Sequence, residues 1–212
     1  MQKLYDDLYQ HSIYREDVNI SDHLYLLQCS RPTLIHTGFH ETARAILPEL
    51  DALLNGQPLS YIFVSHLGAD ECGGLSVMAE KYPHAQVICS EHTARELRGF
   101  GISMSMLIAR PGEQIAGDGF SFRVIEYPSE AHLQSGLLLY EENRGIFFSS
   151  DLMMRSGDGA GAVQTSDWKD EVRATGLRQV PNRYLLRSLR RDLGRIEPRF
   201  VAVGHGFCLK LV

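Results

Sequence analysis

The strongest constraint in this sequence is that a metal-competent side chain follows each of four short apolar segments. Each segment is bounded by turn-forming residues, as expected for a buried strand. The segments are Tyr61–Ser65, Phe120–Glu126, Gly145–Ser149 and Phe200–Val203, and the side chains that follow them are His66, His132, Asp151 and His205. Because the end of a strand is a stiff platform, four such ends can direct their side chains to one point. The pattern therefore predicts a metal site at the strand ends.

The first of these strand ends carries the most information. Val64–Gly74 reads VSHLGADECGG, so His66 follows the strand at once, Asp70 and Glu71 come next, and two glycines open a helix. Imidazole and carboxylate groups are competent ligands for zinc, iron and manganese. A single His or Asp at a strand end is more often a surface residue, a turn former or a helix cap. It is the order and spacing of the whole set that favours a metal site.

The other periodic segments predict the fold class. Further strands are expected at His23–Gln28, Thr33–His36, Gln86–Cys89 and Gly136–Tyr140, and helices at Thr42–Leu54, Gly74–Tyr82, Glu91–Phe100 and Pro181–Arg195. Strands come first, then strand–helix units, then a hairpin with its turn at Asn143–Gly145, and then a helix and a strand. This order favours two sheets sandwiched between helices over one parallel sheet. No linker or repeat divides residues 1–212, so we expect a single domain.

The composition argues against several other classes of function. The net charge is −5 and no basic run is present, which disfavours binding to nucleic acid or to an anionic membrane. No segment approaches the roughly 20 apolar residues of a membrane span, and the charged N-terminus lacks an apolar signal core. The four cysteines are scattered without a C-x-x-C pair, so we expect reduced thiols and a cytoplasmic protein.

The order of these residues resembles the metallo-β-lactamase superfamily, whose motif H-x-H-x-D-H is followed by a His, a bridging Asp and a final His. It is most similar to the β-lactamase-like domain of flavodiiron proteins and of free-standing oxygen-binding di-iron proteins, which carry H-x-E-x-D-H-x-G. The helix and strand after the first motif, and the segment Gly145–Met153 (GIFFSSDLM), have a similar layout. The resemblance covers roughly residues 20 to 207 and implies a four-layer αββα sandwich.

The resemblance also implies a pair of metal ions with Asp151 shared between them. The ligands implied for the first ion are His66 and His132, and those for the second are Asp70, Glu71 and His205. A bridging carboxylate holds two cations close together and offsets their repulsion. A carboxylate-rich set favours iron or manganese over zinc, although zinc binds such a mixture too, and we prefer iron.

Three positions depart from the family pattern. Gly68 stands where the family has His or Glu, so one ligand of the first ion is missing. Glu71 stands where the family has His, and His36 stands where the superfamily has Asp. One hypothesis is that Glu130, in the loop before His132, replaces the carboxylate lost at position 68.

Three functions stay open on this evidence. In the preferred one, a reduced di-iron pair binds O₂ or NO, which is then sensed or is reduced with electrons from a separate partner. No flavin is expected within the chain, because a flavodoxin domain, a G-x-G-x-x-G fingerprint and a Walker loop are all missing. In the second, the protein is a di-metal hydrolase. A metal-activated water, oriented by Asp70 as catalytic residue, attacks an ester, thioester, lactone or phosphodiester. In the third, the site is degenerate and the domain is an interaction module. The resemblance also implies a homodimer.

Residues near the motifs carry weaker signals. His36 and His40 lie four residues apart, and they either hydrogen-bond to a metal ligand or form a local turn pair. Trp168 falls in the charged segment Asp167–Glu171, which we expect to be a loop. There the indole would pack over the site or contribute to a dimer surface.

Overall fold

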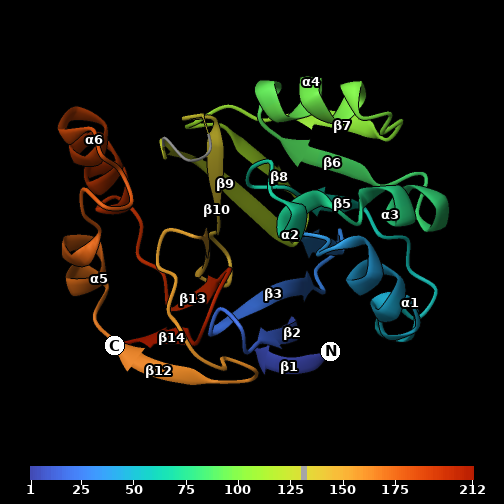
Figure 1. The fold of residues 1–212 in the computed structure, drawn as a ribbon, viewed down its shortest axis with the longest axis horizontal. Helices are drawn as coiled ribbons and strands as arrows, with labels where there is room; N and C mark the ends of the chain where they lie inside the picture. The colour runs from blue at the N-terminus through green and yellow to red at the C-terminus, as the bar shows by residue number, and fades with distance from the viewer. Residues whose placement is uncertain (130–132) are drawn as a thin grey trace.

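Two seven-stranded sheets lie between layers of helices in the computed structural model, which describes residues 1–129 and 133–212 (Figure 1). The strand orders are β1-β2-β3-β4-β5-β6-β7 and β12-β14-β13-β11-β10-β9-β8. Helices α1, α3 and α4 lie on one side of the molecule, and α5 and α6 lie on the opposite side. This arrangement confirms the four-layer αββα sandwich. No described helix is long and apolar enough to cross a membrane.

The first sheet is antiparallel from β1 to β4 and parallel from β4 to β7. Its strands are β1 (Gln2–Tyr5), β2 (Leu8–Arg15), β3 (Ile20–Leu27), β4 (Thr33–Ile35), β5 (Tyr61–Phe63), β6 (Gln86–Cys89) and β7 (Ser105–Ile108). The helices between the parallel strands are α1 (His40–Leu54), α2 (Ala69–Cys72), α3 (Leu75–Lys81) and α4 (Glu91–Gly99). Because β4 and β5 are parallel, the loops that follow them emerge at the same edge.

The second sheet contains the strand ends that carry Asp151 and His205. Its strands are β8 (Gln114–Gly117), β9 (Phe120–Tyr127), β10 (Gly136–Glu141), β11 (Ile146–Ser150), β12 (Val163–Ser166), β13 (Phe200–Val203) and β14 (Cys208–Leu211). Its helices are α5 (Trp168–Ala174) and α6 (Arg183–Leu193). Strands β11 and β13 are parallel neighbours, with Ser150 opposite Val203. Asp151 and His205 therefore leave the sheet side by side.

Alternation along β3 divides the apolar residues between two cores. Tyr25 and Leu27 pack into the core shared by the two sheets, and Leu24 and Leu26 pack into the core under α1, α3 and α4. Successive side chains of a strand point to opposite faces, so a strand buried on both faces can be apolar throughout. The two sheets are thus fixed against each other by one continuous core, which holds the strand ends in place.

The segment around Trp168 is helical, so the expectation of a loop was wrong. Asp167 caps α5 by accepting a hydrogen bond from the backbone N–H of Asp170 at 3.1 Å. The indole packs edge-on against Phe147 with ring centroids 5.3 Å apart, and its Nε1 donates to the Leu193 carbonyl. Trp168 therefore packs into the core of its own chain.

Candidate metal centre

His66 follows β5 and points its Nε2 atom at two carboxylates. The distance from Nε2 is 3.4 Å to Oε2 of Glu71 and 3.6 Å to Oδ2 of Asp151. The other ring nitrogen, Nδ1, lies 3.0 Å from the Ser65 hydroxyl. A hydrogen bond at one ring nitrogen fixes the ring and directs the other nitrogen toward a cation, which is how metal-bound histidines are oriented.

Glu71 joins His66 and Asp151, whereas the sequence analysis grouped it with Asp70 and His205. The three ligand atoms of His66, Glu71 and Asp151 lie within 4.8 Å of one another. The physical reason is the glycine at position 68, because a Cβ atom there would overlap the Glu71 carboxylate. Burial, and then the charges of Asp70 and Asp151, raise the pKa of Glu71 well above its usual value.

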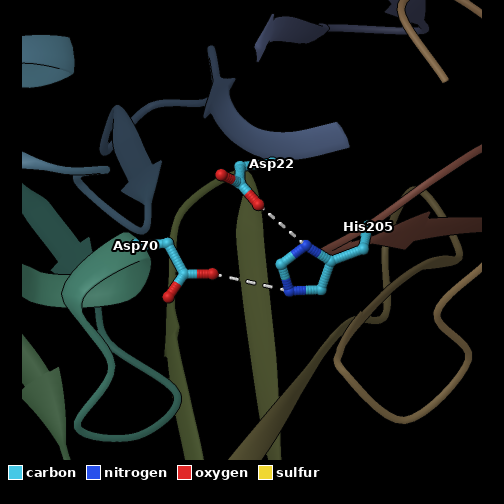
Figure 2. A group of neighbouring side chains, drawn as sticks. All are labelled: Asp22, Asp70 and His205. Atoms are coloured by element: carbon cyan, nitrogen blue, oxygen red, sulfur yellow. Dashed lines mark ion pairs between the residues drawn. The ribbon is translucent and has the colours of Figure 1, made fainter. Parts of the chain in front are cut away.

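His205 follows β13 and joins Asp22 and Asp70 in a second group of side chains, beside the first group of His66, Glu71 and Asp151. Its Nε2 atom lies 3.3 Å from Oδ1 of Asp151 and 3.5 Å from Oδ2 of Asp70. Its Nδ1 atom lies 3.2 Å from Oδ1 of Asp22, on the other side of the ring from Asp70 (Figure 2). Burial alone would lower the pKa of His205, but its hydrogen bonds to Asp151 and Asp22 and the nearby carboxylate charges raise it to about 10.

Asp22, on β3, is the residue that the sequence analysis missed. It is buried, and Nε of Arg15 lies 2.7 Å from its Oδ2 atom. Burial acts to raise the pKa of Asp22, but hydrogen bonds from His205 and Arg15 outweigh it and lower the pKa. An isolated backbone bridge places Asp22 opposite His205. The signal available in the sequence was an Asp directly before the apolar run that begins at His23.

Asp151 lies between the two groups. Its Oδ2 atom faces His66 and its Oδ1 atom faces His205. The structure therefore gives Asp151 the position that a shared carboxylate requires. Asp70 and Asp151 are the most exposed members of the two groups, with side chains 23 % and 20 % accessible.

The described residues fit a cation by both spacing and charge. Donor atoms about 2.0–2.2 Å from one ion lie about 3 to 3.5 Å apart, close to the separations of 3.3 to 3.6 Å between these donors. Three carboxylates, those of Asp70, Glu71 and Asp151, converge on two imidazoles in a largely buried site. Buried carboxylates are costly unless a cation or hydrogen-bond donors satisfy them. Oε2 of Glu71 has no hydrogen-bond partner among the described residues.

Two predicted ligands, Glu130 and His132, lie outside the described residues. His36 is buried beneath the site and reaches a ligand indirectly, because its Nε2 atom lies 2.8 Å from the Ser65 hydroxyl that contacts His66. His40 is exposed, and its hydrogen-bond partners among the described residues are Arg44 and Ser76.

Comparison with known proteins agrees with this geometry. The model of the ODP family of beta lactamases matches residues 20–206. The anaerobic nitric oxide reductase flavorubredoxin of Vibrio vulnificus is 23% identical over 141 residues, which cover 65% of this chain and 28% of that protein. The chain thus matches less than a third of the length of this curated relative.

Two solved structures share the fold. The flavodiiron protein from Giardia intestinalis superposes with a TM-score of 0.79 at 17% identity, covering 99% of this chain and 55% of that one. Rubredoxin oxygen:oxidoreductase from Desulfovibrio gigas gives a TM-score of 0.78 at 16% identity, covering 99% and 57%. The family match runs from the start of β3 to Gly206, so it includes every residue of both groups. This chain therefore belongs to the ODP family of beta lactamases.

Proposed function

We propose that this chain provides a non-haem di-iron site for the binding or reduction of O₂ or NO. The observation that carries the proposal is the pair of His–carboxylate groups that face the single carboxylate of Asp151 from opposite sides. Two relatives support O₂ and NO as substrates by their names, since one is a nitric oxide reductase and the other an oxygen oxidoreductase.

Each residue of the centre has a role in this proposal. His66 and Glu71 hold one ion, Asp70 and His205 hold the other, and Asp151 serves both. Iron is preferred because carboxylates outnumber imidazoles among the described donors, and hard oxygen donors suit iron and manganese. Bound iron supplies the redox chemistry. His132 stays a predicted ligand of the first ion.

Access to the centre suits a small ligand. The two histidines and Glu71 are almost completely buried, and the exposed edge is formed by Asp70 and Asp151. A diatomic molecule can approach over these carboxylates without displacing the core. Reduction of O₂ or NO consumes electrons, and we expect them to come from a separate protein. The name of the Desulfovibrio gigas relative, which pairs rubredoxin with oxygen, supports that expectation.

The test is anaerobic loading with ferrous iron, followed by iron analysis and visible spectroscopy during addition of O₂ or NO. We expect about two iron ions per chain and a spectrum that changes with either gas. His205→Asn should lose iron, because it removes the donor of the second group. His40→Asn is the matched control, because His40 is exposed and its partners in the part of the chain that the structure describes are Arg44 and Ser76.

Two results would overturn the proposal. One is a wild-type protein that retains no iron after loading. The other is an iron-loaded protein whose spectrum does not change with either gas but which hydrolyses a thioester or a phosphodiester. That second result would favour the hydrolase alternative, with Asp70 orienting the water.

A further inference from the structure

Gly68 and Glu71, at the start of α2, form a matched pair. Gly68 is the N-terminal cap of this helix, with φ −131° and ψ 152°, a conformation that any residue can adopt. The backbone therefore does not need a glycine here. The limited space around position 68 requires a glycine. A Cβ atom there would overlap Oε2 of Glu71 and lie 3.0 Å from its Cδ and 3.2 Å from Oδ1 of Asp70.

The carboxylate that fills this space is buried beside two others, those of Asp70 and Asp151. Glu71 is 2% exposed, and its Oε2 atom has no hydrogen-bond partner among the residues that the structure describes. Nε2 of His66 lies 3.4 Å from Oε2 of Glu71 and 3.6 Å from Oδ2 of Asp151. An unsatisfied buried carboxylate aimed into such a group is the arrangement that a cation completes.

We propose that Glu71 is a direct ligand of the ion held by His66 and Asp151, and that Gly68 is the residue that admits its carboxylate. Positions 68 and 71 lie three residues apart, so a side chain from one can reach the space above the other. The carboxylate missing at position 68 is thus supplied one helical turn later, from the same segment. This inference rests on the proposed metal centre and gives Glu71 the role that the sequence analysis offered to Glu130.

With this assignment each half of the centre has one imidazole and two carboxylates among the described donors, and Asp151 is counted in both. With Glu71 committed to the first ion, the described donors left for the second are Asp70, Nε2 of His205 and the shared Asp151. Asp22 faces Nδ1 of His205 and so orients the ring instead of joining its Nε2 side (Figure 2). Loss of Glu71 should therefore affect the first ion far more than the second.

The test measures equilibrium binding of Co²⁺ alone, by dialysis with metal analysis and by the visible absorption of the bound ion. It compares the wild type with Glu71→Ala, Gly68→Ala and the double variant. We expect Glu71→Ala to weaken the site that contains His66 about 100-fold or more. Gly68→Ala should weaken it in the wild type, because the new methyl group displaces the carboxylate, but should cause no further loss in the Glu71→Ala background.

Moving the carboxylate from position 71 to position 68 tests whether Glu71 acts as a metal ligand or only as a structural residue. Gly68→Glu combined with Glu71→Ala should recover much of the lost affinity, because the oxygen returns to the same space from the other position. Gly99→Ala is the matched control, since a Cβ atom there meets nothing within 4 Å. Thermal unfolding of each metal-free variant shows that it is folded.

The outcomes distinguish this inference from the proposed function. Wild-type affinity in Glu71→Ala overturns the ligand role of Glu71 while leaving the metal centre standing. Independent, additive losses from the Gly68 and Glu71 substitutions overturn the spatial link between them. A wild-type chain that binds neither Co²⁺ nor Fe²⁺ overturns both this inference and the proposed function.

Discussion

His36 is held in a conformation that few residues adopt, directly beneath the candidate centre. Its φ is 62°, in the left-handed region, and its ring is almost completely buried. Its Nε2 atom contacts the Ser65 hydroxyl at 2.8 Å, and that hydroxyl lies 2.9 Å from the hydroxyl of Ser150. Burial lowers the pKa of His36 to about 4, so the ring is neutral in the folded protein. The ring thus joins both sheets through two serine hydroxyls.

The lowered pKa of His36 predicts a loss of stability in acid. The unfolded state takes up this proton near pH 6.5 and the folded state only near pH 4, so stability falls as the pH drops between these values. At pH 4.5 the loss should be about 2 to 3 kcal/mol. His36→Asn tolerates the left-handed backbone and removes the titration. Urea unfolding of metal-free protein at pH 7.5 and 4.5 should therefore show a smaller pH effect in the variant than in the wild type.

His23 provides the internal reference for this experiment. Burial lowers its pKa to about 4 as well, so the variant should keep the part of the pH dependence that comes from His23. An unchanged pH dependence in His36→Asn would mean that the buried ring is not titrated on unfolding, against the prediction.

Asp22 should act on metal binding without touching the metal. It holds Nδ1 of His205 at 3.2 Å and is itself held by Arg15. In Asp22→Asn the amide can donate a hydrogen bond to Nδ1 of His205. This would place the ring proton on Nε2, the nitrogen that faces the metal, and would remove the negative charge that makes the ring a stronger metal ligand. We expect a 10- to 100-fold loss of Co²⁺ affinity, measured by equilibrium dialysis. Asp17→Asn, an exposed aspartate in the turn before β3, should bind as the wild type does. Equal affinity in both variants would remove Asp22 from the centre.

Among the elements, the strands buried on both faces were the predictable ones. Gln86–Cys89 and Phe200–Val203 coincide with β6 and β13, because central parallel strands are continuous apolar runs. Two of the six strands that were missed are β2 and β12. Their sequences, LYQHSIYR and VQTS, are rich in polar residues, and what makes them strands is backbone pairing with β3 and β14. A seven-residue helix such as α5 is too short for its periodicity to stand out.

The centre was predictable to the extent that it depends on where strands end. The ends of β5, β11 and β13 bring His66, Asp151 and His205 together as the spacing indicated. Asp22 was missed because the strand was read from His23, whereas β3 begins at Ile20 and pairs Asp22 across to His205. The direction of the Glu71 side chain could not be predicted, because side-chain direction in a short helix depends on the space at position 68, which only the packed structure defines.

At the scale of the molecule, the centre joins the two sheets. His66 and Asp22 come from the first sheet, and Asp151 and His205 come from the second. A cation bound between them would link the halves of the sandwich at one edge, where carboxylates otherwise face one another. Metal that binds only the folded chain stabilises it by mass action.

Metal addition should therefore raise the thermal unfolding temperature of the whole chain. At a free Co²⁺ concentration 100 times the dissociation constant, the gain in the free energy of unfolding is about 3 kcal/mol, measured against the same protein in chelator. His205→Asn should lose the part of this gain that comes from the ion bound at Asp70 and His205, because the second sheet then contributes only Asp151 to the described donors. If metal raised the unfolding temperature of His205→Asn as much as that of the wild type, His205 would not be a ligand. A cross-sheet ligand set requires the stabilisation to depend on donors from both sides of the sandwich.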